Sequence, residues 1–177
     1  MGHATETDFL PVNIAVLTVS DSRTLAEDKS GDILVERLEG AGHVLGDRAI
    51  VVDEVDEIVA KFQQWIDDRN IDIVIATGGT GLTGRDVTPE ALAQVAEKDI
   101  PGFGELFRWI SYQKIKTSTI QSRATAAVAG GTYLFALPGS PGACRDAWDE
   151  ILVHQLDIRY KPCNFVEMMP RLTEHLD

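Results

Sequence analysis

Three short apolar runs along the chain have the pattern of strands that are buried on both faces. Residues 13–19 (NIAVLTV) and 71–77 (IDIVIAT) are almost continuously apolar, and residues 48–52 (RAIVV) form a shorter run between them. A strand with one solvent-exposed face alternates between apolar and polar residues, whereas a strand covered by helices on both faces does not. We therefore predict strands in the interior of a sheet.

The intervals between these strands have helical periodicity. The first interval repeats apolar residues at Ile33, Leu34, Leu38 and Ala41, and the second at Val55, Ile58, Val59, Phe62, Trp65 and Ile66. Residues spaced by three and four lie on one face of a helix. The order strand, helix, strand, helix, strand predicts an α/β fold with a mostly parallel central sheet and right-handed crossovers.

The middle of the chain predicts further helices. Thr88 and Pro89 are typical of an N-cap and the first helical residue after it, and we expect this helix to be broken at residues 101–102 (PG). Residues 103–110 predict another amphipathic helix, and residues 118–121 predict a short helical turn.

The last part of the chain predicts a β-hairpin and a final helix. Residues 124–128 and 133–137 are apolar and flank two glycines at 130–131, which is the pattern of a tight hairpin. Apolar residues at helical spacing then predict a helix over residues 144–156.

Length and composition indicate a single domain. The chain has 177 residues, of which 44% are hydrophobic, so one core can be filled. We expect residues 1–10 to form a flexible N-terminal arm and residues 11–177 to form the domain. The apolar runs are too short to cross a bilayer, and residues 1–8 lack the apolar segment of a signal peptide, so we expect a cytoplasmic protein.

Charge and cysteine content narrow the classes of partner. The formal net charge is −12, which argues against a broad nucleic-acid-binding surface. An anionic ligand must then be held by backbone N–H groups, a few arginines or a metal. Cys144 and Cys163 show no C-x-x-C spacing, so we interpret both as buried thiols in a reducing compartment.

The most distinctive segment is TGGTGLTGRD at residues 77–86, between the third predicted strand and the next helix. Glycines let several N–H groups converge on a ligand, most often a phosphate. The spacing of Gly79, Gly81 and Gly84 matches the dinucleotide fingerprint, but it follows the third strand, and no acidic residue ends the strand after it. Arg85 and Asp86 also replace the Lys-Ser/Thr of a Walker A loop. We predict a third kind of anion-binding loop; the alternative is a turn without a ligand.

Two aspartates are candidate metal ligands. Asp53 follows the second predicted strand, and Asp86 follows the glycine loop. Each has an alternative interpretation as a helix cap or turn residue. Because the carboxyl ends of parallel strands meet at one edge of the sheet, one crevice can hold both carboxylates with a phosphate, which favours Mg²⁺ between them. The polar loops at residues 20–23 and 138–142 also follow apolar strands and should line the same edge.

These motifs resemble the family of molybdenum cofactor biosynthesis proteins. That family includes the MoaB/Mog molybdopterin adenylyltransferases and the G domain of gephyrin. The matching strings are at residues 77–91, 101–105, 122–123 and 137–141, and the segments 117–123 and 144–165 are similar to the B-type members. The resemblance covers about residues 10–166 and implies a three-layer α/β/α molybdopterin-binding, Rossmann-like fold.

The resemblance also implies a reaction and a site. In the adenylyltransferases the terminal phosphate of molybdopterin attacks the α-phosphate of ATP, and pyrophosphate is released. Catalytic and Mg²⁺-binding roles fall on Asp53 and Asp86. Contacts to ATP and molybdopterin are expected among Ser20, Asp21, Thr77, Gly78, Gly79, Thr80, Gly81, Arg85, Ser122, Arg123, Pro138, Gly139 and Ser140.

An alternative function remains within the same family. Some B-type members have lost the RDVTP pattern, which this chain retains at residues 85–89. Retention of the pattern favours the adenylyltransferase. The alternative is a non-catalytic molybdopterin-binding or scaffold protein, and the two differ in whether ATP is converted to pyrophosphate when molybdopterin is present.

Aromatic residues after position 101 predict an oligomer. Trp109 and Tyr112 lie three apart, on a helical face different from that of Phe103, Phe107 and Ile110. An exposed aromatic patch is typical of an interface. The resemblance implies trimers, and hexamers of two trimers among B-type members. We predict a trimer-based homo-oligomer with residues 103–115 at a contact; the alternative is that Trp109 packs within one chain.

Overall fold

A six-stranded sheet forms the centre of the molecule, in the order β2-β1-β3-β6-β5-β4. The computed structural model describes residues 7–176. The strands are β1 (Asn13–Val19), β2 (Val44–Val51), β3 (Ile73–Thr77), β4 (Lys98–Asp99), β5 (Thr125–Ala129) and β6 (Thr132–Leu137). β2, β1, β3 and β6 are parallel, whereas β5 and β4 add an antiparallel edge.

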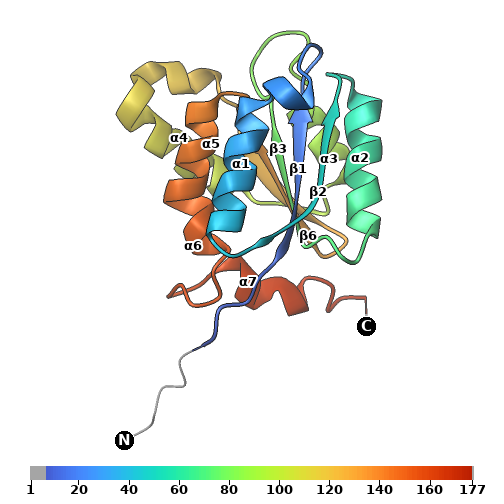
Figure 1. Cartoon of the computed structure of the whole chain (residues 1–177), viewed down its shortest axis with the longest axis vertical. Coiled ribbons are helices and arrows are strands. Elements are labelled where there is room, and N and C mark those ends of the chain that lie inside the picture. The colour runs from blue at the N-terminus through green and yellow to red at the C-terminus, as the bar shows by residue number, and fades with distance from the viewer. Residues whose placement is uncertain (1–6, 177) are drawn as a thin grey trace, which may run out of the picture.

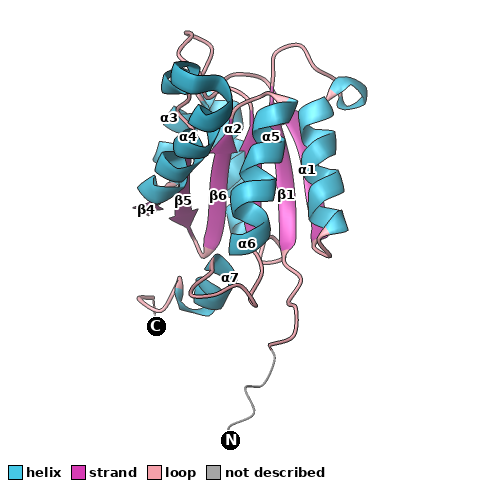
Figure 2. Ribbon diagram, turned by 90° about the vertical axis from the view of Figure 1, so that its left-hand side faces the viewer, coloured by secondary structure: helices cyan, strands magenta, loops and turns pink. Residues whose placement is uncertain are grey.

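Helices cover both faces of this sheet (Figure 1). One face is covered by α1 (Lys29–Gly40), α4 (Pro101–Ile115) and α5 (Pro141–Ala147), which continues through a π-helical turn (Trp148–Leu152) into α6 (Val153–Gln155). The other face is covered by α2 (Val55–Asp67) and α3 (Thr88–Val95). The short helix α7 (Phe165–Met168) lies at the end of the sheet where the N-terminal segment enters (Figure 2). The prediction of a mostly parallel three-layer α/β/α fold is confirmed.

The core consists of two apolar clusters, one on each side of the sheet. Successive residues of β1 alternate between them: Ile14 and Val16 belong to the cluster under α1 and α5, and Ala15 and Leu17 belong to the cluster under α2. All four side chains are buried. The continuous apolar pattern of this strand therefore reflects burial on both faces, as predicted.

Several predicted boundaries differ from the structure. β2 begins at Val44 instead of Arg48, and the short edge strand β4 was not predicted. The last long helix begins at Pro141, because Ser140 caps it by accepting a hydrogen bond from the Ala143 N–H. No helix within residues 7–176 is long and apolar enough to cross a membrane.

Two assignments of single residues were wrong. Thr88 is not the N-cap of α3, since Val87 occupies that position and the Thr88 hydroxyl donates to the Gly78 carbonyl at 2.8 Å. Cys144 is buried as predicted, but Cys163 is exposed because the segment after α6 lies at the surface. Residues 1–6 of the predicted N-terminal arm lie outside the described part of the chain. Within the described part of that arm, the centroid of the Phe9 ring lies 5.1 Å from that of the His43 ring.

Candidate active site

A cavity of about 510 Å³ lies where β1, β3 and β6 end, at the carboxyl edge of the parallel strands. Its lining includes the following residues predicted from the sequence: Ser20, Asp53, Gly78, Gly79, Thr80, Gly81, Asp86, Ser122, Pro138, Gly139 and Ser140. The predicted residues Asp21, Thr77, Arg85 and Arg123 stand behind this lining. A larger cavity, about 780 Å³, lies at the opposite edge beside the C-terminal segment and contains none of these residues.

The glycine loop is held by hydrogen bonds to its carbonyl groups. Thr88 binds two of them, with its hydroxyl on Gly78 O at 2.8 Å and its N–H on Gly79 O at 3.0 Å. Arg123 binds the next two, with its N–H on Thr80 O at 2.9 Å and its Nε on Gly81 O at 2.7 Å. The loop is thus fixed to the start of α3 on one side and to the segment before β5 on the other.

Glycine is required where this loop leaves β3. Gly78 has φ +103° and Gly79 has φ +66°, in the left-handed region that side chains disfavour. A Cβ at Gly78 would lie 2.2 Å from the Val19 carbonyl oxygen, and a Cβ at Gly79 would lie 2.4 Å from the Thr88 hydroxyl. The turn therefore brings the backbone close to β1 and α3, where no side chain fits.

In the described part of the chain, the carbonyl groups of the loop are hydrogen-bonded, but two of its N–H groups are not. Within residues 7–176, the N–H groups of Gly79 and Thr80 donate no hydrogen bond. Both residues line the cavity. Unpaired backbone N–H groups seek an acceptor, and converging N–H groups on a glycine-rich turn suit a phosphate. This arrangement can bind an anion without a basic side chain.

Asp86 is a fixed, ionised carboxylate at the end of this loop. It accepts hydrogen bonds from the Thr83 N–H at 2.8 Å and the Thr83 hydroxyl at 2.7 Å. Burial alone would raise the pKa of Asp86, but the hydrogen bonds from Thr83 and the Gly81 backbone, with the charge of Arg123, hold it below its ordinary value. The geometry also fits its alternative interpretation as a turn residue, because the Thr83 contacts are those of a local turn.

Asp53 experiences the opposite electrostatic environment. Burial raises the pKa of Asp53 most, and the negative charges of Asp21 and, to a smaller extent, Asp86 raise it further. A backbone hydrogen bond from Asp21 and the charge of Arg85 oppose this rise without cancelling it. Asp53 forms no ion pair in the described part of the chain. Two carboxylates that face one cavity and repel each other favour a cation between them.

The residues present fit a hard divalent cation only in part. No group of three or more histidine, cysteine, aspartate or glutamate side chains within residues 7–176 is arranged to hold a metal ion. Asp53 and Asp86 together supply carboxylate oxygens, the ligands that Mg²⁺ prefers. Mg²⁺ commonly binds through one or two carboxylates and completes its coordination with substrate phosphates and water. The site therefore fits Mg²⁺ that arrives with a phosphate ligand better than a metal held by protein alone.

Arg85 and Asp21 form an ion pair outside the cavity lining. Arg85 donates to both Asp21 oxygens at 2.8 and 2.9 Å and to the Glu54 carboxylate at 2.7 Å. The hydrogen bond from Arg85 lowers the pKa of Asp21, and the Asp53 N–H, 3.0 Å away, adds to this effect. The pair thus joins the loops after β1, β2 and β3, and it positions Asp53.

Arg123 is also occupied by protein groups. Besides its two loop contacts, its guanidinium donates to the Asp86 carbonyl at 2.7 Å and pairs with the Glu90 carboxylate. Arg85 and Arg123 are both among the residues expected to contact ATP or molybdopterin. In this geometry both guanidinium groups bind protein groups around the loop.

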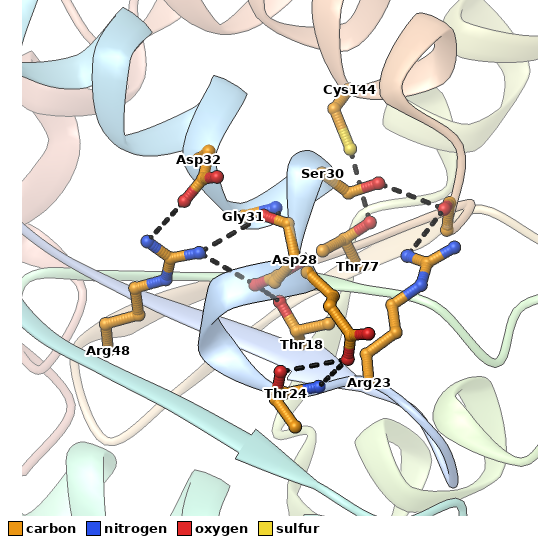
Figure 3. A network of polar contacts seen from close by, with 12 residues as sticks. Thr18, Arg23, Thr24, Asp28, Ser30, Gly31, Asp32, Arg48, Thr77 and Cys144 are labelled. Carbon is orange, nitrogen blue, oxygen red and sulfur yellow. Dashed lines mark hydrogen bonds and ion pairs between the residues drawn. The ribbon is translucent and has the colours of Figure 1, made fainter.

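A buried polar network supports the other side of the cavity (Figure 3). Asp28 is fully buried and accepts hydrogen bonds from the Thr18 hydroxyl at 2.6 Å, the Gly31 N–H at 2.9 Å and Arg48 at 2.9 Å. Thr77, predicted as a contact residue, points into this network and donates to the Pro138 carbonyl at 2.9 Å. It supports the 138–140 loop from beneath.

Residues of α4 and the turn after it form a wall that the sequence did not reveal. Phe107, Ser111, Ile115, Ser118 and Gln121 line the cavity. The helical turn Lys116–Gln121 follows α4 directly, and Lys116 at its start has φ +55°. The periodicity of α4 showed an amphipathic helix but not which loop it faces. Arg23 also lines the cavity, and its only sequence signal was its place in the loop after the first strand.

Comparison with known proteins decides the family. A model of the probable molybdopterin binding domain matches residues 15–158, a segment that contains every residue of the cavity lining. The chain belongs to the MoaB/Mog family of molybdenum cofactor biosynthesis proteins. Molybdenum cofactor biosynthesis protein B of Escherichia coli (strain K12) is 48% identical over 159 residues, which cover 90% of this chain and 94% of that protein.

Other members of the family are also similar to this chain in sequence and structure. The protein of the same name from Bacillus subtilis (strain 168) is 42% identical over 146 residues, covering 82% of this chain and 86% of that one. A crystal structure of a molybdenum cofactor biosynthesis protein B superposes with a TM-score of 0.84 at 36% identity, covering 93% of this chain and 98% of that chain. The Mog protein of Mycobacterium ulcerans has a TM-score of 0.74 at 30% identity, covering 82% and 97%. The family resemblance noted from the motifs is confirmed.

Proposed function

We propose that this protein is a molybdopterin adenylyltransferase that uses Mg-ATP and releases pyrophosphate. The observation that carries the proposal is that one cavity combines the free N–H groups of Gly79 and Thr80 with the carboxylates of Asp53 and Asp86. The first pair suits phosphate oxygens, and the second suits a divalent cation. Membership of the family supplies molybdopterin as the second substrate.

The reaction needs positioning and charge neutralisation more than a protein nucleophile. An oxygen of the terminal phosphate of molybdopterin forms a bond to the α-phosphorus of ATP as the bond from that phosphorus to the bridging oxygen of the β-phosphate breaks. Pyrophosphate leaves with the electron pair of the broken bond. In-line displacement requires the two phosphates to be held on a common axis.

The residues of this chain have separate tasks in that step. The N–H groups of Gly79 and Thr80 bind phosphate oxygens, and the tied carbonyls of residues 78–81 keep these donors in place. Asp53 and Asp86 would hold Mg²⁺, which neutralises charge on the ATP phosphates when bound. The side chains of Phe107 and Ile115 give the cavity lining an apolar part, which suits a pterin ring.

Asp86→Asn tests the catalytic role of this carboxylate. The substitution keeps the shape of the side chain and can still accept from Thr83, so folding should survive, but the metal-binding charge is lost. We expect pyrophosphate release with molybdopterin and Mg-ATP to fall by on the order of 10²-fold or more. Turnover of the variant at the parent rate would leave Asp86 as a turn residue.

The same assay separates the two candidate functions. The parent is measured with Mg-ATP alone, with molybdopterin alone and with both, and pyrophosphate is the product detected. Release that depends on both substrates supports the transferase. A parent that binds molybdopterin but forms no pyrophosphate would instead be the non-catalytic molybdopterin-binding or scaffold protein.

A further inference from the structure

The cavity has two ends of opposite chemical character. Asp53 precedes α2 and Asp86 precedes α3, so the carboxylates lie on the side of the sheet that these helices cover. Arg23 and Gly139 lie at the other end, beside the N-termini of α1 and α5. A ligand that spans the cavity therefore meets acidic groups at one end and a basic group at the other.

Arg23 differs from the other two arginines of the site. Arg85 and Arg123 are paired with carboxylates. Arg23 has no acidic partner within the described residues 7–176, although the whole chain carries 28 acidic and 16 basic side chains. Among these residues its guanidinium makes one hydrogen bond, from Nη1 to the Gly139 carbonyl at 3.3 Å. Since a guanidinium has five N–H donors, most of them remain free.

The position of Arg23 is fixed by the residues around it. The Ser20 hydroxyl oxygen accepts hydrogen bonds from the N–H groups of Ser22 at 3.3 Å and Arg23 at 3.2 Å. After Arg23, the Thr24 hydroxyl donates to the Glu27 carboxylate at 2.9 Å, in a capping box. The loop thus presents the side chain from a backbone held at both ends.

The Gly139 carbonyl that Arg23 contacts is also held by a buried residue. Figure 3 shows Arg23 and Ser30 reaching one backbone carbonyl, that of Gly139. Ser30 is fully buried and donates its hydroxyl hydrogen to this carbonyl at 3.0 Å. Ser30 belongs to α1, whose N-cap is the buried Asp28. The carbonyl that orients Arg23 therefore belongs to the buried network.

We propose that Arg23 binds the terminal phosphate of the pterin substrate, at the end of the cavity opposite the carboxylates. This assignment rests on the proposed function. In an in-line displacement the attacking and leaving oxygens lie on opposite sides of the phosphorus. The glycine loop and the carboxylates take the ATP phosphates, so the attacking phosphate approaches from the Arg23 end. Arg23 offsets the repulsion between the two anions and orients the attacking oxygen.

The test compares two variants of Arg23 with a control. Arg23→Gln removes the charge, and Arg23→Lys keeps the charge but loses the fork of donors. Arg171→Gln is the matched control, because Arg171 is an exposed arginine outside the cavity lining that pairs with Glu174. Dissociation constants are measured for Mg-ATP, for molybdopterin, and for molybdopterin whose terminal phosphate has been removed with phosphatase.

The expected result is selective for the phosphate. Arg23→Gln should weaken molybdopterin binding by roughly 10- to 100-fold, the usual effect of losing a charge-assisted hydrogen bond. Arg23→Lys should fall in between, and the affinities for Mg-ATP and dephosphorylated molybdopterin should stay at the parent values. Arg171→Gln should match the parent throughout.

Three other outcomes overturn the assignment. Parent-like molybdopterin binding by Arg23→Gln would show that Arg23 is only a surface residue. A loss confined to Mg-ATP would move its contact to the nucleotide. Both outcomes leave the proposed function standing, because the parent still binds its substrates. A parent that binds neither Mg-ATP nor molybdopterin would end the proposed function and this assignment with it.

Discussion

Gly81 illustrates how one atom can matter in the phosphate loop. A Cβ at this position would lie 2.7 Å from Oδ2 of Asp86, so any side chain displaces that carboxylate. Gly84 belongs to the same loop, but a Cβ there meets nothing within 4 Å. The two glycines therefore differ in steric environment although both carry no side chain.

This difference predicts unequal effects of the same substitution. Gly81→Val should weaken Mg-ATP binding by about tenfold or more, equivalent to about 1.4 kcal/mol, with a much smaller loss of thermal stability. Gly84→Val should bind Mg-ATP like the parent. Calorimetric titration and thermal melting of both variants check the prediction. Equal affinity for Gly81→Val would move the nucleotide away from this loop.

At the scale of single elements, the N-terminus of α1 depends on a buried ion pair. Asp28 is fully buried, whereas the Arg48 side chain remains one-fifth exposed at 20%. Burial would raise the pKa of Asp28, but hydrogen bonds from Thr18, Gly31 and Arg48 hold it below its ordinary value of 3.8. The carboxylate is therefore stabilised in its charged form by the folded chain.

Asp28→Asn should lower the free energy of unfolding by about 3 kcal/mol at neutral pH, because Arg48 loses its buried partner. A group whose folded pKa is lowered contributes stability that is present above its unfolded pKa and lost as the pH falls through the folded pKa. The difference between parent and variant should thus shrink below pH 3.8. Urea denaturation at neutral and acidic pH measures both effects. Asp32→Asn is the control, since Asp32 contacts the same arginine but is exposed.

The elements that could be predicted from the sequence are those with a repeated apolar pattern. β1, β3 and α2 were predicted closely, because burial on one or two faces fixes the types of many consecutive residues. β4 has only two residues, Lys98 and Asp99, and both are exposed, so no pattern marks it. Thr88 has the residue type of an N-cap, but its hydroxyl is taken by Gly78, a contact set by tertiary structure.

The same distinction holds for the candidate site. The glycine loop and both aspartates were found because they occur in one motif or follow strands. Arg23 was placed at this edge only as part of its loop, and the wall formed by α4 was not predicted, because both roles depend on which segments meet in space. The ion pairs of Arg85 and Arg123 could not be inferred either, since their partners Asp21, Glu54 and Glu90 are distant from them in the sequence.

At the scale of the whole molecule, α4 carries a patch of exposed apolar side chains. Trp109 is 65% exposed and Tyr112 is 47% exposed, whereas Phe103 and Phe107 on the other face are buried. The alternative, that Trp109 is buried against its own chain, is therefore wrong. The patch continues through Ile115, which also lines the cavity. An assembly through this patch would place a neighbouring chain beside the site.

We predict a trimer-based homo-oligomer, and favour a hexamer over a trimer, with this patch at a contact. Light scattering at low micromolar concentration should give three or six times the 19.4 kDa monomer mass. Trp109→Glu should reduce the mass, because a buried interface does not accept an unpaired charge. Leu176→Glu serves as the control, as Leu176 is exposed but belongs to the C-terminal segment. A monomeric parent would contradict the predicted oligomer. An unchanged mass for Trp109→Glu would show that this patch is not at a contact.

The ties between the glycine loop and its surroundings have an entropic consequence. All the carbonyls of residues 78–81 are bound by Thr88 or Arg123, so this segment is ordered before any ligand arrives. A ligand that binds a flexible loop loses affinity to the ordering of that loop. In this protein the loop loses its conformational entropy when the chain folds, before any ligand binds. The hydrogen bonds of a phosphate with Gly79 and Thr80 therefore contribute to affinity with little entropic cost from the loop.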